Sequence, residues 1–407
     1  MGVFYISIPN LQRLLIKPFE FLYTGILASL HVLALPLVGL FSLKSKYRNS
    51  LKARFLARKH ALNSPPILWF HACSFGEIKS LQALLDQFPQ VPILLTTTTQ
   101  TGFDLACAAY AQNPHIQVRF LLFETLLFLW RKDLAHLKAL VVTEAELWFN
   151  VFRLAKSVGA QTFLINARIS ERSYPRYQRF KSFYAYLFEQ VDHIYAQTPL
   201  DQERLATLGA QNAQIFPNLK LFNPPKISHT YAKPDYLIFL AASTHPSEEE
   251  LILKAFLALN DPHARLLIAP RHPERFTEVK ALLENQGVVF NSLSKGFDLD
   301  QSVFVIDKLG VLNDFYPLAD VVILGGSFVP IGGHNPLEPA FFGVKLISGK
   351  HIFNQEALFA CVQNYALIEP EQLGSTLANH AQLLPSFLDT HNHEISRLAH
   401  AIYPTSL

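Results

Sequence analysis

The sequence of 407 residues contains little cysteine, few charged residues and one methionine. Its three cysteines, Cys73, Cys107 and Cys361, are odd in number and far apart. This spacing indicates neither a disulfide framework nor a zinc knuckle, and it favours a reducing compartment. Half of the residues are apolar, which excludes a disordered tail and allows sizeable cores. The net charge of +3 gives no indication of nucleic-acid binding.

Acidic residues are almost absent from the first 66 positions. Glu20 is the only acid there, against nine basic residues: Arg13, Lys17, Lys44, Lys46, Arg48, Lys52, Arg54, Arg58 and Lys59. This part therefore carries +8, and the remaining chain carries −5 of the total of +3. The length of the chain predicts two or three domains, and the positive charge belongs to one end.

An uncharged run of 23 residues, from 21 to 43, lies within this basic part. At about 1.5 Å per residue, a helix of this length crosses a hydrocarbon core of roughly 30 Å. The basic cluster from Lys44 to Lys59 follows directly. By the positive-inside rule it places the rest of the chain in the cytoplasm, and it suits anionic headgroups. We predict a membrane anchor; the alternatives are an in-plane helix, a buried core helix and, less favoured, a cleaved signal peptide.

Two series of apolar strands alternating with amphipathic helices follow the anchor. The first series predicts strands at 67–71, 91–95, 139–143, 162–165 and 193–196, and the second at 236–241, 266–269, 303–306, 321–324 and 346–348. Continuous apolar strands between helices are typical of parallel sheets covered on both faces. The sequence therefore predicts an α/β protein with two Rossmann-like domains facing each other.

A Pro-rich stretch at 218–234 separates the two series and indicates a linker. We accordingly place the anchor and its basic segment at 1–60, a first Rossmann-like domain at 61–222 and a second at 223–407. By its position in the sequence, the last helix is assigned to the second domain; the alternative is that it packs on the first domain.

The common nucleotide-binding fingerprints are missing. No G-x-G-x-x-G follows a predicted strand and no G-x-x-x-x-G-K-[ST] is present, which argues against a dehydrogenase and a P-loop NTPase. Asp298-Leu299-Asp300 has the D-x-D pattern of metal-dependent sugar-nucleotide enzymes. This three-letter pattern lies in a polar stretch, and we interpret it as a solvated loop.

Carboxylates follow two of the predicted strands in the first series. Glu77 ends the segment His71-Ala-Cys-Ser-Phe-Gly-Glu77, at the carboxyl end of a strand, where α/β folds place ligands. There it is suited to accept a proton from a hydroxyl, but an acid in a first helical turn also complements the helix dipole. The pattern alone does not separate these roles. Glu144 and Glu146 follow another buried strand, and their spacing alone favours solvent-facing side chains.

Two strand ends in the second series also carry polar residues. Pro246 suits the first position of a helix, with Thr244 or His245 as the cap. Arg271 follows the next strand, and its forked guanidinium is suited to bind a phosphate or a carboxylate.

Glycines cluster at 325–326 and at 332–333, the second pair within Gly-Gly-His-Asn-Pro-Leu-Glu-Pro. Glycine lets backbone N–H groups approach a phosphate closely, and a helix that begins here would direct its N-terminus at an anion. We predict Asn335 as the N-cap, Pro336 at the first helical position and Glu338 at the third. The pattern favours this capping role of Glu338 over a hydrogen bond to a ribose.

Taken together, these segments resemble the 3-deoxy-D-manno-octulosonic acid (Kdo) transferases of lipopolysaccharide synthesis. The resemblance covers most of the chain in order, through HACSFGE, TTTTQTG, EAELW, INARISERS, NLK, AASTH, PRHPERF, DKLG and GGSFVPIGGHNPLEP. It implies a GT-B fold with an N-terminal anchor, on the cytoplasmic side of the bacterial inner membrane. It also implies an inverting enzyme, without metal or cofactor, that transfers Kdo from CMP-Kdo to a lipid A precursor, lipid IVA.

The resemblance assigns roles residue by residue. Glu77 matches the proton acceptor of the family, and Glu144 and Lys220 match positions that stabilise the transition state. The segments that bind CMP in the family correspond to Pro270, Arg271, Leu309, Gly310, Val311, Asn335, Pro336, Leu337 and Glu338. The resemblance thus favours functional roles for Glu77 and Glu338, which capping can accompany.

Several positions depart from the family pattern. Residues 73–77 replace Val-Ser-Val-Gly-Glu, and Phe149 replaces a proline. Residues 217–222 replace Gly-x-Leu-Lys-Phe-Asp, so the acid of that segment is lost, and Val311 replaces a glutamate. These departures affect the finer nucleotide contacts. Another inverting GT-B transferase acting on a lipid-linked sugar, and a catalytically inactive membrane scaffold, are the alternatives.

Overall fold

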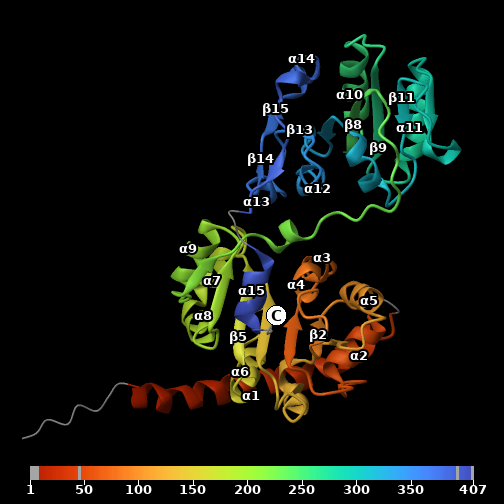
Figure 1. Cartoon of the computed structure of the whole chain (residues 1–407). Helices are drawn as coiled ribbons and strands as arrows, with labels where there is room; N and C mark the ends of the chain where they lie inside the picture. The colour runs from red at the N-terminus through yellow and green to blue at the C-terminus, as the bar shows by residue number, and fades with distance from the viewer. Residues whose placement is uncertain (1–8, 45–46, 391–393, 405–407) are drawn as a thin grey trace, which may run out of the picture. The chain divides into compact units, whose positions relative to one another are not determined.

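The computed structural model describes residues 9–44, 47–390 and 394–404, with side chains from residue 19 onward. The chain forms two compact units. Unit 1 comprises Met1–Leu219 and His393–Leu407, and unit 2 comprises Lys220–Asn392. Each unit is built on its own sheet, as can be followed in Figure 1, and each of the two sheets has seven strands.

The sheet of unit 1 is parallel throughout, with the order β3-β2-β1-β4-β5-β6-β7. Its strands are β1 (Leu68–His71), β2 (Ile93–Thr97), β3 (Ile116–Phe120), β4 (Ala139–Thr143), β5 (Gln161–Ala167), β6 (His193–Ala196) and β7 (Ala213–Ile215). The five central strands were predicted from their apolar runs. The two edge strands were not, because polar residues such as Gln117 and Gln214 interrupt their short sequences.

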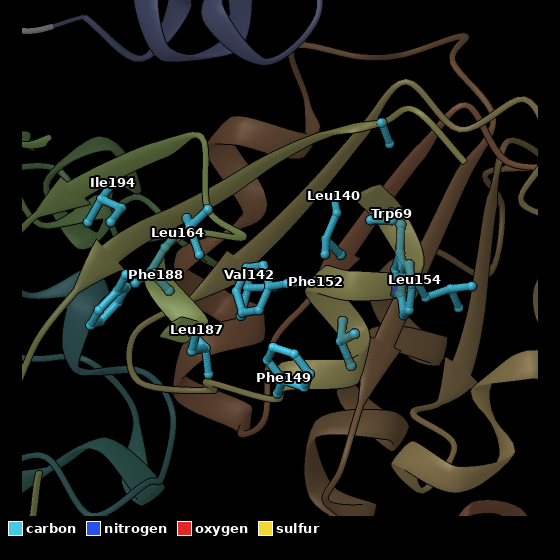
Figure 2. Close-up of a cluster of buried hydrophobic side chains, with 14 of the residues drawn as sticks. Trp69, Leu140, Val142, Phe149, Phe152, Leu154, Leu164, Leu187, Phe188 and Ile194 are labelled. Carbon is cyan, nitrogen blue, oxygen red and sulfur yellow. The ribbon is translucent and has the colours of Figure 1, made fainter. Parts of the chain in front are cut away.

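Helices cover both faces of this sheet. They are α3 (Phe75–Ser80), α4 (Gln82–Leu85), α5 (Gln100–Ala109), η1 (Glu124–Trp130), α6 (Phe149–Ser157), α7 (Tyr174–Arg179), α8 (Lys181–Phe188) and α9 (Pro199–Thr207). Figure 2 shows the core between the sheet and these helices, where Trp69 and Val142 from strands meet Phe149, Phe152 and Leu187 from helices. Full burial of each such side chain stabilises the fold by roughly 1.5–3 kcal/mol. This packed layer holds the strands in place, and with them the strand ends that carry the candidate site.

Unit 2 repeats the architecture with the strand order β10-β11-β9-β8-β12-β13-β15, again parallel. Its strands are β8 (Leu237–Thr244), β9 (Ala264–Pro270), β10 (Phe290–Ser292), β11 (Val303–Val305), β12 (Val321–Leu324), β13 (Lys345–Gly349) and β15 (Tyr365–Ile368). A separate two-stranded antiparallel sheet consists of β14 (Val362–Gln363) and β16 (Phe387–Leu388), which precede and follow β15 along the chain.

The helices of unit 2 are α10 (Glu248–Leu257), α11 (Arg275–Asn285), α12 (Leu337–Ala340), α13 (Glu356–Phe359) and α14 (Leu373–Ala378). Short 3₁₀ turns connect them: η2 (Leu219–Phe222), η3 (Leu293–Lys295), η4 (Leu312–Asp314), η5 (Tyr316–Leu318), η6 (Pro370–Gln372) and η7 (His380–Gln382). Apolar side chains pack on both faces of the sheet, among them Phe239, Phe304 and Tyr316. The predicted fold class, two parallel α/β domains, is confirmed.

Each sheet has a point at which the strand order reverses, between β1 and β4 in unit 1 and between β8 and β12 in unit 2. At such a point the loops from neighbouring strands run to opposite faces and leave a crevice at the carboxyl edge, where α/β proteins bind ligands. The segments that follow these four strands begin at residues 72, 144, 245 and 325. Among the predicted site residues, they contain Glu77, Glu144 and Asn335 to Glu338.

The two ends of the chain both belong to unit 1. The N-terminal helix α1 (Pro9–Phe41) is continuous, and α2 (Arg48–Phe55) follows it. Within the described residues, the stretch Phe19–Phe41 of α1 is the one helix long and apolar enough to cross a membrane. The C-terminal helix α15 (Ile395–Ile402) packs against α4 of unit 1, where Figure 1 shows it in blue.

Candidate functional site

Glu77 lies at the carboxyl end of β1, in the first turn of α3, and its side chain is buried. Its carboxylate accepts three hydrogen bonds: from the Cys73 N–H and the Thr143 hydroxyl on Oε2, both at 2.8 Å, and from the Ser74 hydroxyl on Oε1 at 2.8 Å. Ser74 also caps the helix, since its hydroxyl accepts from the Glu77 N–H. The structure therefore holds the carboxylate in one orientation while Oε1 retains a free lone pair.

Glu144 lies one residue beyond Thr143, which contacts Glu77. Its backbone has φ of +54°, a left-handed conformation that costs a non-glycine residue about 1–3 kcal/mol and clusters at functional sites. The Glu144 N–H donates to the Ile165 carbonyl of the next strand at 3.0 Å, which holds the turn in place. The loops after β1 and β4 thus bring two predicted site residues to the same edge of unit 1.

Glu146, the second acid of this loop, contacts protein groups on one side of its carboxylate and is only partly exposed to solvent. Its Oε2 accepts from the indole N–H of Trp148 at 2.7 Å and lies 3.5 Å from Nε2 of the fully buried His71. Burial favours the neutral acid, but the contacts with His71 and Trp148 outweigh it, so the pKa of Glu146 is lowered. The spacing argument for a solvent-facing Glu146 was therefore wrong, because a buried histidine from a neighbouring strand draws the side chain inward.

Cys73 and Arg54 complete this part of unit 1. Burial, followed by the charge of Glu146, raises the pKa of the Cys73 thiol to about 12, and its Sγ lies 2.7 Å from the Thr98 hydroxyl. Arg54 comes from α2, and its guanidinium lies 5.9 Å from the ring of Trp148. Burial lowers the pKa of Arg54, whereas Cys73 and Glu146 act against that shift. Sequence analysis did not assign Arg54 to the site, since only the fold brings α2 to this edge.

Lys220 follows a segment that is anchored at the same edge of unit 1. The Leu219 N–H donates to Asn166 Oδ1 at 3.2 Å, and the Asn218 amide donates to Gln197 at 3.0 Å. Asn166 has φ of +52°, where the pairing of β5 and β6 is irregular. This network fixes the chain immediately before Lys220, the first residue of unit 2.

In unit 2, four of the predicted CMP-binding residues surround one small cavity of about 70 Å³. They are Pro270, the last residue of β9, Arg271, which follows it, and Leu309 and Gly310 after β11; Ser243 and Lys308 join them. The Arg271 side chain is exposed, while its N–H donates to the Thr244 carbonyl at 3.0 Å. Val311, the fifth predicted residue here, follows Gly310 and packs on the core of unit 2.

A pair of histidines that sequence analysis did not identify as a site lies nearby. The Nε2 atoms of His245 and His334 are 2.8 Å apart and the rings stack 5.0 Å apart, so one ring donates and the other accepts. Burial, together with His245 and Arg271, lowers the pKa of His334 to about 4. Burial and the neighbouring cations also lower the pKa of His245. Both rings are therefore neutral near pH 7 and link the loop after β8 to the loop after β12.

The Gly325–Gly326 loop does not offer its N–H groups to a phosphate. The buried carboxylate of Glu248 accepts from the N–H groups of Gly326, Ser327 and Phe328 at 2.8–3.1 Å, and from that of His245 at 3.0 Å. Gly326 has φ of +69°, and a side chain there would strike the His334 ring. This part of the glycine prediction was wrong, because an internal carboxylate fills the anion-binding loop.

Two predicted helix starts also differ from the structure. Helix α10 begins at Glu248 after Ser247, whose φ is +72°, so Pro246 is not its first residue. The N-cap is Ser247, whose side chain makes no capping bond, and only the backbone carbonyl of His245 accepts from the Glu248 N–H, at 3.1 Å. Instead Thr244 donates to Glu249 at 3.0 Å. The two carboxylates at the start of α10 satisfy the preceding loop, which moves the helix start towards the C-terminus.

The segment Asn335–Glu338 forms a shorter cap than predicted. Helix α12 begins at Leu337 and spans four residues, and Pro336 precedes it. Asn335 Oδ1 accepts from the Leu337 N–H at 3.1 Å, so it still caps the helix, while Glu338 accepts from the Asn335 amide at 3.2 Å. Glu338 therefore sits at the second helical position, and its bond is to the Asn335 side chain. The charges of Glu338 and Arg271 both act on the pKa of the buried Tyr316, which burial raises.

The D-x-D acids lie in an exposed loop, and the Asp300 N–H donates to Asp298 at 2.9 Å. Within the described residues, no group of three or more His, Cys, Asp or Glu side chains is arranged to hold a metal ion. Arg271 and Lys308, which line the small cavity, are cations that suit an anionic ligand.

A comparison with solved protein structures identifies the fold class of this chain. A solved structure of a putative UDP-N-acetylglucosamine 2-epimerase from Listeria monocytogenes matches 83% of this chain and 96% of that chain, with 13% sequence identity and a TM-score of 0.52. At this identity the match concerns the fold alone. It is the two-domain fold of GT-B glycosyltransferases, with which the two parallel sheets agree.

The family follows from sequence similarity. A family profile described as 3-deoxy-D-manno-octulosonic-acid transferase matches residues 49–223. The 3-deoxy-D-manno-octulosonic acid transferase of Haemophilus influenzae is 34% identical over 362 residues, which are 84% of this chain and 84% of that protein. The crystal structure of the C-terminal CMP-Kdo binding domain of WaaA from Acinetobacter baumannii matches 42% of this chain and 91% of that domain, with 29% identity and a TM-score of 0.34. The chain belongs to the Kdo transferase family, and it is a glycosyltransferase.

Proposed function

We propose that the protein transfers Kdo from CMP-Kdo to a hydroxyl of the glucosamine disaccharide of a lipid A precursor, lipid IVA, with inversion at the anomeric carbon. Membership of the Kdo transferase family supports the transferred sugar. The observation that carries the mechanism is the carboxylate of Glu77, which three hydrogen bonds hold at the carboxyl end of β1.

Inversion requires one direct displacement. The acceptor hydroxyl oxygen attacks the anomeric carbon of Kdo, the bond from that carbon to the CMP phosphate oxygen breaks, and CMP leaves with the electron pair. The hydroxyl proton passes to Glu77, whose Oε1 has a lone pair available. A positioned base of this kind contributes about 10²–10⁴-fold to the rate. Glu144 and Lys220 stabilise the charge that develops in the transition state, with Lys220 near the leaving phosphate.

The donor binds to unit 2 in this proposal. Arg271 pairs with the phosphate or with the carboxylate of Kdo, and Pro270, Leu309, Gly310 and Val311 form the wall around the nucleotide. The segment from Asn335 to Glu338 completes the nucleotide site, with Glu338 as acceptor for the ribose hydroxyls. Because Arg271 and Lys220 supply the positive charge in this proposal, the reaction proceeds without a metal ion or cofactor.

The division of the chain follows the two substrates. Unit 1, to which the C-terminal helix α15 belongs, forms the acceptor domain, and unit 2 forms the CMP-sugar domain. Residues 1–60 attach the enzyme to the cytoplasmic side of the bacterial inner membrane, where the lipid acceptor resides. The apolar stretch of α1 and the +8 charge of the first 66 residues support this location.

Competition between donors tests the proposal. Purified full-length protein is incubated with a lipid A precursor and CMP-Kdo, UDP-glucose or UDP-N-acetylglucosamine, each with and without EDTA. We expect product from CMP-Kdo alone, unchanged by EDTA, and NMR of the product should show the anomeric configuration opposite to that of the donor. Turnover of a UDP-sugar, a requirement for metal or retention of configuration would contradict the respective part of the proposal.

A further inference from the structure

Helix α1 contacts unit 1 along its whole apolar stretch. Phe19 and Thr24 are shielded, and so is a series that ends just beyond the helix: Glu20, Tyr23, Leu27, His31, Ala34, Val38 and Ser42. The members of this series follow one another at intervals of three or four residues, so they form a single stripe along the helix. From first to last the stripe is about 33 Å long at 1.5 Å per residue, which is the thickness of a hydrocarbon core.

Polar contacts fix this stripe near its N-terminal end. Glu20 forms an ion pair with Arg153 of α6 at 2.8 Å and accepts from the Tyr186 hydroxyl of α8 at 3.1 Å. The Tyr23 hydroxyl donates to Glu124 of η1 at 2.9 Å. The Phe19 ring also packs against the rings of α6 and α8.

The middle of the helix is attached in the same way. His31 is buried; its Nδ1 lies 2.6 Å from the Thr125 hydroxyl and its Nε2 lies 2.9 Å from the Phe55 carbonyl. His31 is the least apolar group of the predicted span, and both of its ring nitrogens are satisfied by unit 1. Seven residues further on, Val38 is buried too.

The remaining surface of α1 is apolar and exposed. Its large side chains include Phe21, Leu22, Ile26, Leu30, Val32, Leu33, Leu37 and Leu40. Among them Leu33 is 73% exposed and Phe21 is 77% exposed. An apolar surface of this extent marks an interaction with a membrane or a partner. The cations Arg48, Lys52, Arg58 and Lys59, on and after α2, form no ion pair with any described residue, and they suit anionic lipid.

A helix perpendicular to the bilayer would carry α6, α8 and η1 into the hydrocarbon core with it, because these elements contact α1 between Phe19 and His31, within its apolar stretch. Their charged groups, such as Arg153, are costly there. We propose that α1 does not span the bilayer but lies in the plane of one leaflet, with its exposed face among the acyl chains and its polar stripe on unit 1. Unit 1 then rests on the membrane surface, with the N-terminus on the same side.

Labelling from the two sides of the membrane distinguishes the orientations. In a variant with Cys73, Cys107 and Cys361 replaced by serine, Gly2→Cys reports the N-terminus and Ser294→Cys reports unit 2. Inverted and right-side-out inner-membrane vesicles are treated with a membrane-impermeant maleimide. We expect both cysteines to react in the same vesicle preparation. Reaction of the two cysteines in opposite preparations would show a transmembrane helix and overturn the proposal.

A second experiment does not depend on the cysteine-free protein. Leu33→Asp places a charge on the exposed face of α1, and Val289→Asp is the matched control because Val289 is 67% exposed in unit 2. On vesicles of phosphatidylethanolamine and phosphatidylglycerol, we expect Leu33→Asp to raise the unbound fraction at least about tenfold, with thermal stability unchanged. Equal binding of Leu33→Asp and the wild type would contradict an embedded face.

An independent observation concerns a cavity of about 690 Å³ in unit 1. Five cations line it, Arg48, Lys52, Arg58, Lys59 and Arg119, and no acid does. None of these five side chains forms an ion pair within the part of the chain that the structure describes. The apolar part of the lining is Phe103, Val118, Phe120 and Leu122.

A site lined by both cations and aromatic rings matches an amphiphile with an anionic head. The rings of Phe103 and Phe120 stack 4.1 Å apart and form a flat apolar wall, and the volume lies in the usual range of ligand pockets. We infer that this cavity binds a lipid phosphate, with the phosphate at the cations and the apolar part against the rings. The phosphate belongs either to a membrane phospholipid or to the glycolipid acceptor.

Binding and kinetics together test this inference and identify the source. Native mass spectrometry of the full-length protein measures binding of dihexanoyl phosphatidic acid against dihexanoyl phosphatidylcholine. We expect preference for phosphatidic acid, weakened at least about tenfold by Lys52→Glu with Arg58→Glu, and not by Lys295→Glu in unit 2. No preference in the wild type would overturn the inference.

The possibility that the glycolipid acceptor supplies the phosphate rests on the proposed function. If the acceptor supplies the phosphate, the double variant raises KM for the phosphorylated lipid A precursor and leaves KM for the dephosphorylated one unchanged. If a phospholipid supplies it, neither KM changes while phosphatidic acid binding falls. Absence of any Kdo transfer would refute the proposed function, yet it would leave the binding result standing.

Discussion

Replacing Glu77 by glutamine separates its two roles, since glutamine keeps the shape and loses the base. The amide oxygen can accept from the Cys73 N–H and the Thr143 hydroxyl, as Oε2 does now. The amide NH₂ faces the Ser74 hydroxyl, which can rotate to accept. All three hydrogen bonds are kept, but each changes from a charged to a neutral bond and weakens by about 1 kcal/mol or less.

The expected cost to stability is therefore about 1–3 kcal/mol, or a few degrees in Tm for a domain of this size. The expected cost to catalysis is larger, because an amide cannot take the hydroxyl proton. Loss of a general base lowers the rate at least about 100-fold, which is about 2.7 kcal/mol or more in the activation free energy. KM for CMP-Kdo should stay within about twofold, since Glu77 does not belong to the donor site.

The matched control is Thr143→Val, which removes one hydrogen bond from the Glu77 carboxylate and retains the base. We expect a similar loss of stability and less than about tenfold loss of rate. Initial rates with CMP-Kdo and a lipid A precursor, together with thermal unfolding of each variant, check both expectations. If Glu77→Gln retained a third of the wild-type rate, or if Thr143→Val lost as much rate as Glu77→Gln, Glu77 would be a structural cap and the assignment as base would fail.

Three further predictions concern buried ionisable groups. Glu248→Gln should destabilise unit 2 by about 2–3 kcal/mol and raise KM for CMP-Kdo, because four N–H groups lose a charged acceptor; thermal unfolding with and without CMP checks this. The pKa of His334 is lowered to about 4, so the unfolded chain takes up a proton that the folded chain does not as pH falls from about 6.5 to 4. The free energy of unfolding should therefore fall between pH 6.5 and pH 4, by at most about 3 kcal/mol. Denaturant unfolding of His334→Asn should show a free energy of unfolding that depends less on pH over this range. Because burial raises the pKa of Cys73 to about 12, a maleimide at pH 7.5 should label the exposed Cys107 well before Cys73; faster reaction of Cys73 would contradict the buried, protonated thiol.

The sequence predicts the central strands well, for a physical reason. A strand buried on both faces must be apolar throughout, so runs such as Ala139–Thr143 and Val321–Leu324 carry their assignment locally. The edge strands β3 and β7 face solvent or a helix on one side and include polar residues, so their sequences resemble loops. Glu77 was predictable as a candidate because it follows a buried strand, although its hydrogen bond to Thr143 was not.

Contacts between distant segments account for what the sequence could not predict. Glu248 fills the loop at Gly326 from 78 residues away, and His245 meets His334 from 89 residues away. No local pattern records such pairings, so the glycine loop was interpreted as a phosphate site and His245 as a possible cap. The attachment of α1 is a similar case. Hydropathy indicates a membrane helix, but that the stripe from Glu20 to Ser42 packs on the rest of unit 1 can be recognised only from the folded structure.

The central claim is that this chain moves Kdo onto a lipid A precursor with Glu77 as the base. Mass spectrometry of the lipid product tests it most directly, after purified full-length protein has been incubated with CMP-Kdo and lipid IVA. The account predicts that the acceptor gains the mass of one or more Kdo residues with the wild type, and that Glu77→Gln yields at least about 100-fold less product in the same time. An acceptor of unchanged mass with the wild type, or equal product from Glu77→Gln, would contradict it.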